Sequence, residues 1–178
     1  MQPRISIITI CYNAASTITR TLRSVSAQTY PNIQYLIIDG ASKDNTLELV
    51  RELAPEAEVY SERDKGIYDA MNKGLDRATG DYVWYVNAGD ALASPTTVED
   101  LVRATCTGDS LPDVLYGDTR LINAEDHDLG LRRLRPPHQL DWRSFRSGML
   151  VCHQAFVAKR SISPHYDLSY RFSADVDW

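Results

Sequence analysis

The chain contains only three cysteines, Cys11, Cys106 and Cys152, and they lie far apart in the sequence. A domain stabilised by disulfides or by a zinc site usually has more cysteines, at closer and more regular spacing. The sequence therefore disfavours both classes of protein, and a reducing compartment, the cytosol, fits it best.

Long apolar runs and an excess of basic residues are also missing. No stretch reaches the ~18 uninterrupted apolar residues of a transmembrane helix, and the first residues do not have the layout of a signal peptide. The formal net charge of −5 argues against a nucleic-acid-binding protein. We expect a cytoplasmic protein without a nucleic-acid partner, with peripheral contact to the inner face of the plasma membrane as a further option.

Three glycine-based signatures are absent as well. There is no Gly-x-Gly-x-x-Gly after the first expected strand, no Gly-x-x-x-x-Gly-Lys-Ser/Thr and no Gly-x-Ser-x-Gly. Dinucleotide enzymes, P-loop NTPases and serine hydrolases of the α/β type are therefore disfavoured. If the chain binds a diphosphate, the alternative is a hard cation such as Mg²⁺ that bridges a carboxylate and the phosphate oxygens.

The first 90 residues alternate between short β-branched segments and amphipathic ones. The expected strands are residues 4–10, 33–38, 59–60 and 82–86, and the expected helices are residues 17–28, 47–53 and 67–78. Such alternation with short crossovers predicts an α/β fold with a mostly parallel sheet and right-handed connections. The length of 178 residues is enough for one such domain with a substantial core.

Each expected strand runs into a polar loop at its carboxyl end. These loops begin at Tyr12, Asp39 and Glu62 and, after the fourth strand, span residues 87–90. One such loop alone is most simply a solvated strand-loop junction. Four on the same edge of a parallel sheet favour a binding site, because ligands of open α/β sheets bind at the carboxyl ends of the strands.

The second half has a different pattern. Residues 98–104 predict a helix, and residues 114–122 alternate like a strand, which we expect to be antiparallel. Residues 131–146 then hold five arginines against one acid, with aromatic residues between them. This stretch is either a solvated face or a contact with an anionic membrane surface or a lipid diphosphate.

Several ordered motifs resemble family 2 glycosyltransferases with the GT-A fold. Residues 38–46 resemble the family's Asp-x-x-Ser-x-Asp-x-Thr segment, and residues 61–74 resemble the Ser-Glu-x-Asp-x-Gly-Ile-Tyr-Asp-Ala-Met-Asn-Lys-Gly segment of a bacterial polysaccharide-synthesis branch. Residues 78–81 and 87–90 stand where the family has Ala-x-Gly-Asp/Glu and its metal motif. The resemblance implies a Rossmann-like GT-A sheet, a nucleotide-diphosphate sugar donor, a divalent metal and inverting sugar transfer in cell-surface polysaccharide synthesis.

The resemblance also assigns residues to the donor nucleotide, with a UDP-sugar as the first candidate. Asp39 would bind the base, and Glu62 and Asp64 would line the nucleotide pocket. Asp64 or Lys65 would reach the ribose or a phosphate, and Tyr12 is an aromatic candidate for stacking on the base or sugar.

The resemblance also assigns residues to the metal and to the catalytic base. Asp90 would bind Mg²⁺ or Mn²⁺, although the family's Asp-x-Asp-Asp has Asn87 at its first acid and a glycine at the middle one. Asn87 would help through its amide oxygen or through a metal-bound water. Asp175 is the expected base, with Asp177 as second choice, and His153 is expected near the diphosphate or acceptor.

We expect one domain, with a nucleotide-sugar half (residues 1–90) and an acceptor and catalytic half (residues 91–178) that continues in the natural protein. The acceptor would be a saccharide or a lipid-linked molecule. Two other functions stay open. One is a non-catalytic nucleotide-sugar-binding core, which the reduced metal motif favours. The other is a sugar nucleotidyltransferase, which would need a phosphate-binding loop after the first strand that the chain lacks.

Overall fold

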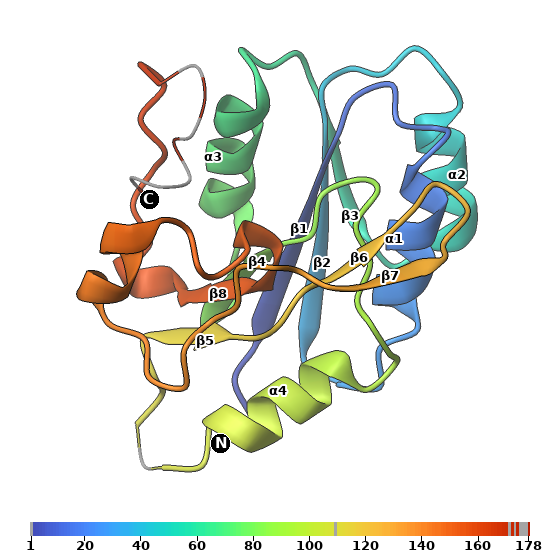
Figure 1. The fold of residues 1–178 in the computed structure, drawn as a ribbon. Coiled ribbons are helices and arrows are strands. Elements are labelled where there is room, and N and C mark those ends of the chain that lie inside the picture. Colours follow the sequence, from blue (N-terminus) through green and yellow to red (C-terminus); the bar gives the residue numbers. More distant parts are fainter. Residues whose placement is uncertain (1, 109, 171, 173, 175–177) are drawn as a thin grey trace.

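A computed structural model describes residues 2–108, 110–170, 172, 174 and 178 (Figure 1). Four βα units open the chain. They comprise β1 (Ile5–Cys11), α1 (Ile18–Ser26), β2 (Ile33–Asp39), α2 (Thr46–Leu53), β3 (Glu58–Ser61), α3 (Ile67–Arg77), β4 (Tyr82–Tyr85) and α4 (Thr97–Thr105). The expected alternation is confirmed, with element ends shifted by a few residues.

The second half supplies short strands and single turns of 3₁₀ helix. These are β5 (Val114–Tyr116), β6 (Arg120–Ile122), β7 (Asp128–Leu131), η1 (Trp142–Ser147), η2 (His153–Ala155), β8 (Phe156–Lys159) and η3 (Arg160–Ile162). The single strand expected over residues 114–122 is wrong. The chain leaves the main sheet at Gly117, and β6 pairs instead with β7 in a separate antiparallel ribbon.

Among the described residues, the main sheet has six strands in the order β3-β2-β1-β4-β8-β5. β1 to β4 are mutually parallel, and β8 runs antiparallel between β4 and β5. The order reverses between β1 and β4, because β2 and β3 lie on one side of β1 while β4 lies on the other. This is the topological switch point, where open α/β sheets bind ligands outside the carboxyl ends of the strands.

Helices cover both faces of the sheet (Figure 1). Alternate strand residues pack in opposite directions, so that Ile7 and Trp84 face α1 and α4 while Ile8 and Tyr85 face α3. α3 lies unusually close to β1: a Cβ added to Gly74 would lie 2.6 Å from Ile8 Cγ2. Burial on both faces explains the near-continuous apolar strands of the sequence.

Candidate functional site at the carboxyl edge of the sheet

The loops after β1 and β2 are joined by hydrogen bonds. The backbone N–H of Asn13 donates to Ser42 Oγ (2.8 Å), and the N–H of Lys43 donates to Asn13 Oδ1 (2.9 Å). Asn13 has a φ of 47°, a left-handed conformation that asparagine tolerates better than most residues. The two loops therefore form one wall at the carboxyl edge.

Asp39 lies beneath this wall and is completely buried. Its carboxylate accepts hydrogen bonds from the Ser42 N–H (3.0 Å), the Ser42 hydroxyl and the Ser61 hydroxyl (2.6 Å). Burial and the nearby charge of Asp39 raise the pKa of Cys11, which is therefore a neutral core thiol. Asp39 therefore links the ends of β1, β2 and β3 through its contacts with Cys11 and Ser61. Its role in base binding stays a prediction.

A cavity of about 320 Å³ opens at Gly40, the residue that follows Asp39. It is lined by Tyr12, Gly40, Ala41, Lys43, Arg63 and Asp64. The Tyr12 side chain is 62% exposed at its mouth. A Cβ on Gly40 would lie 2.6 Å from Asp64 Oδ2 and 3.2 Å from the Tyr12 ring, so only glycine lets these side chains approach. The structure thus brings together Tyr12 and Asp64, two of the predicted nucleotide-binding residues.

Three other predicted nucleotide residues, Asp39, Glu62 and Lys65, do not line this cavity. The Glu62 carboxylate lies 3.6 Å from Lys73 Nζ and 3.5 Å from Arg77 on α3. The backbone N–H of Lys65 donates to Asp69 Oδ2 (2.9 Å), also on α3. These contacts fix the loop before α3, and the proposed contacts of Glu62 and Lys65 with a nucleotide stay predictions.

The turn of residues 87–90 follows β4 at the switch point and is held by α1. Thr21, fully buried on α1, donates to the Asp90 carbonyl (2.7 Å) and accepts from the Gly89 N–H (3.0 Å). The Asp90 N–H closes the turn on the Asn87 carbonyl (2.9 Å). Sequence reasoning missed Thr21. The only signal was a hydroxyl among the apolar inward positions of the helix, next to Leu22.

The Asp90 carboxylate is held partly away from water. Burial raises its pKa, while the side chain of Gln154 and the charge of Arg20 act in the opposite direction. Three residues earlier, Asn87 Oδ1 is buried and has no hydrogen-bond partner in the described residues. A partly buried carboxylate and, in the same turn, a buried amide oxygen without a partner both cost free energy, and a bound cation would offset that cost.

These two oxygen ligands fit a hard divalent cation that also binds diphosphate oxygens. Within the described ranges, no group of three or more His, Cys, Asp or Glu side chains could hold a metal by itself. From the described residues, Asp90 and the amide of Asn87 would be the ligands that the protein contributes, and this assignment stays a prediction.

A second cavity of about 320 Å³ begins at Asn87. Arg132, His153 and Gln154 line it from the second half of the chain, and Tyr68 lines it from α3. His153 stacks on Tyr85 of β4 (5.6 Å between ring centroids), and its Nε2 lies 2.7 Å from the Tyr166 hydroxyl. The structure thus brings the predicted residues Asn87 and His153 to one cavity.

α3 also fixes the segment that leads to the predicted catalytic base. The Asn72 side chain donates to the Tyr166 carbonyl (3.0 Å) and accepts from the Tyr166 N–H (2.7 Å). The Tyr68 hydroxyl accepts from the Ala174 N–H (3.1 Å). Asp175 and Asp177 lie outside the described residues, so their role stays a prediction.

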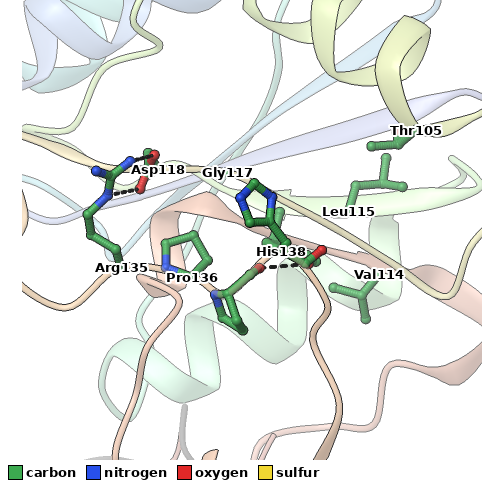
Figure 2. Close-up of a pocket in the computed structure, with 10 residues that line it drawn as sticks. Thr105, Val114, Leu115, Gly117, Asp118, Arg135, Pro136 and His138 are labelled. Carbon is green, nitrogen blue, oxygen red and sulfur yellow. Dashed lines mark hydrogen bonds and ion pairs between the residues drawn. The ribbon is translucent and has the colours of Figure 1, made fainter. Parts of the chain in front are cut away.

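A larger cavity, about 640 Å³, lies elsewhere, along β5 at the edge of the sheet (Figure 2). There Arg135 donates two hydrogen bonds to the Asp118 carboxylate (3.0 and 2.5 Å), which lowers the pKa of Asp118. None of the predicted site residues lines it. Cavity volume therefore does not indicate where the functional site lies. The arrangement of the strand ends indicates it.

A mostly parallel sheet with a polar site at its switch point is typical of α/β proteins that bind small ligands, and this chain has both features. The chain belongs to the family described as "Glycosyl transferase family 2", whose sequence model matches residues 6–165. The part of the chain that the structure describes contains no helix that is both long and apolar enough to cross a membrane.

Relatives with curated names agree with this assignment. An "Uncharacterized glycosyltransferase" of Mycobacterium tuberculosis strain H37Rv is 33% identical over 183 residues, covering 99% of this chain and 67% of the relative. A "PGL/p-HBAD biosynthesis glycosyltransferase" of the same strain is 32% identical, covering 99% and 68%. The "Putative teichuronic acid biosynthesis glycosyltransferase TuaG" of Bacillus subtilis is 36% identical over 93 residues, covering 50% and 37%. The chain thus spans about two thirds of the length of the two mycobacterial relatives.

Solved structures support the fold. The mannosyltransferase PcManGT of Pyrobaculum calidifontis, in complex with GDP-Man and Mn²⁺, has a TM-score of 0.54 and 28% identity, covering 58% of this chain and 32% of that one. TarS of S. aureus (residues 1–349, with UDP-GlcNAc) has a TM-score of 0.54 and 24% identity, covering 62% and 33%. The protein is a glycosyltransferase of the GT-A fold, a transferase of class EC 2.4. This confirms the expected family, fold and enzyme class.

Proposed function

We propose that the protein is an inverting, metal-dependent glycosyltransferase of cell-surface polysaccharide synthesis. It transfers a sugar from a nucleotide-diphosphate donor to a saccharide or lipid-linked acceptor. The observation that carries the proposal is the unpaired, buried Oδ1 of Asn87 close to the partly buried Asp90, at the switch point of the sheet. Residues 1–90 form the donor half of one domain, and residues 91–178 form its acceptor half.

The donor nucleotide occupies the cavity between Tyr12 and Asp64, with a UDP-sugar as the first candidate. The exposed Tyr12 ring offers a stacking surface for the base, and Asp64 faces the ribose. Asp39 sets the floor of the site, while Glu62 and Lys65 shape the loop before α3. PcManGT, which binds GDP-Man with Mn²⁺, supports a nucleotide-sugar donor through family membership.

Asp90 and Asn87 would hold Mn²⁺ or Mg²⁺ together with the donor diphosphate. Bound there, the cation supplies positive charge that stabilises the diphosphate as a leaving group. The protein aligns the donor by holding its base above Asp39 and its diphosphate at the turn of residues 87–90. This fixed geometry converts binding energy into orientation of the reacting carbon.

Asp175 removes the proton from the acceptor hydroxyl, with Asp177 as the alternative base. The acceptor oxygen attacks the anomeric carbon from the face opposite the diphosphate, so the configuration inverts in one displacement. The Asp175 carboxylate orients the acceptor and takes its proton, and His153 would lie near the diphosphate or the acceptor. A lipid-linked acceptor would bring the protein to the inner face of the plasma membrane from the cytoplasm.

The experiment is a calorimetric titration with UDP, GDP and dTDP in the presence and absence of Mn²⁺, followed by donor hydrolysis. We expect one nucleotide to bind in a metal-linked way and its sugar donor to be hydrolysed slowly. Binding without turnover, unchanged by Asp175→Ala, would favour a non-catalytic binding core. If none of the three nucleotides bound, the proposed function would be wrong.

A further inference from the structure

Arg132 differs from Arg135 and Arg143 of its stretch, each of which lies near a carboxylate. Arg135 pairs with Asp118, and Arg143 lies 3.8 Å from Asp141. Arg120, on the adjoining ribbon, pairs with Asp128. Arg132 has no carboxylate partner within the part of the chain that the structure describes.

Four hydrogen bonds hold the Arg132 guanidinium in place, and all of them go to backbone carbonyls. Nη1 donates to Leu134 (3.2 Å), Met149 (3.1 Å) and Leu150 (3.3 Å), and Nη2 donates to Met149 (3.1 Å). Carbonyl oxygens orient the guanidinium, but they are neutral acceptors and do not compensate its positive charge. A guanidinium has five N–H donors, and the Nε–H makes no contact in the described residues.

This cation lines the same cavity as Asn87 and His153, and it is half-buried. A freely solvated surface arginine would not be fixed by four contacts. An uncompensated charge that is partly removed from water costs free energy, and the cost is offset when an anion binds. The planar fork of arginine suits phosphate oxygens in particular.

We propose that Arg132 is a phosphate-binding residue of the sugar-transfer cavity, contacting a diphosphate from the side opposite the turn of residues 87–90. The proposal rests on the proposed function and adds a ligand that the sequence motifs do not assign. The diphosphate belongs either to the nucleotide donor or to a lipid-diphosphate acceptor. Both present the same oxygens, and the experiment separates them.

The test compares Arg132→Met and Arg132→Lys with the neighbouring, exposed Arg133→Met as a matched control. Calorimetry measures binding of uridine, UDP and geranyl diphosphate to each protein. Loss of one charge-assisted contact should weaken UDP binding in Arg132→Met by about tenfold to a hundredfold, with uridine unchanged. Arg132→Lys should retain most of the affinity because it keeps the charge.

Weakened geranyl diphosphate binding with unchanged UDP binding would place the acceptor phosphate at Arg132. The proposal is overturned if neither diphosphate binds more weakly than to Arg133→Met, or if uridine binding falls in parallel with UDP. Should Arg132→Met not fold, the ¹⁵N signal of the Arg132 Nε in the wild type decides: it should shift with UDP or geranyl diphosphate and not with uridine. If the wild type bound no nucleotide, the proposed function would fail, and inorganic pyrophosphate would still test Arg132 by the same signal.

Discussion

Replacing Thr21 with valine removes one hydroxyl from the buried face of α1 while the side-chain volume hardly changes. That hydroxyl is the link between α1 and the turn of residues 87–90: it donates to the Asp90 carbonyl (2.7 Å) and accepts from the Gly89 N–H (3.0 Å). Thr21→Val therefore leaves two backbone groups of the proposed metal turn without this partner.

The size of the effect follows from these two groups. Leaving a buried donor or acceptor unsatisfied costs roughly 1–3 kcal/mol, so the two groups together should lower the free energy of unfolding of Thr21→Val by about 2–6 kcal/mol. Without this link the turn of residues 87–90 is less ordered, so it must be ordered when the metal and UDP bind. Ordering costs about 1–2 kcal/mol of conformational entropy per residue. Metal-linked UDP binding should weaken by about tenfold or more.

Thr21→Ser is the matched control, because it keeps the hydroxyl and removes only a methyl group, at about 1 kcal/mol. Urea denaturation measures stability, and calorimetry measures UDP affinity with Mn²⁺. The serine variant should bind UDP as the wild type does. If the valine and serine variants are equal in both stability and UDP affinity, the Thr21 hydroxyl does not hold the turn and the reasoning is refuted.

Three further outcomes are expected. Because burial raises the pKa of Asp90, the folded protein binds its proton more tightly than the unfolded chain does, so the ionised carboxylate lowers stability above that raised pKa. Asp90→Asn should raise the Tm of the metal-free protein at about pH 8 and change it little near about pH 3, where both folded and unfolded chains largely hold the proton; an equal Tm at about pH 8 contradicts this. Tyr12→Ala should weaken UDP binding by roughly 1–3 kcal/mol through lost stacking without changing Tm, and unchanged affinity would exclude Tyr12 as the base platform. Asn72→Ala should lower the free energy of unfolding by about 1–3 kcal/mol in urea denaturation, because both backbone groups of Tyr166 lose their partner; Lys43→Ala, on the exposed surface, is its control.

Local patterns in the sequence were enough to predict the βα units. Residues 82–86 are all apolar or aromatic and residues 4–10 are rich in isoleucine, as expected of strands buried on both faces. The break at Gly117 was missed, because the alternation of residues 114–122 continues through it. In the folded chain β5 ends at Tyr116, and Asp118 just beyond it pairs with Arg135, 17 positions further on, a contact that local alternation does not reveal.

The site was predicted in outline for the same reason. Strand ends of a parallel sheet meet at one edge, so Tyr12, Asp64 and Asn87 could be placed there from order alone. Thr21 could not, since it contacts a turn 68 or 69 positions away. Nor could the sequence separate Arg132 from its neighbours, because only the folded chain shows that backbone carbonyls fix its guanidinium at a cavity.

The central claim, a metal and diphosphate site at Asp90, is tested most directly by the coupling between Mn²⁺ and UDP. Calorimetry measures UDP affinity with and without Mn²⁺ for the wild type, Asp90→Asn and Asp100→Asn, a control carboxylate on α4. Coupled ligands typically change each other's affinity by about 5–150-fold. We predict such an enhancement for the wild type and Asp100→Asn and its loss in Asp90→Asn. An enhancement of the same size in Asp90→Asn would contradict the account.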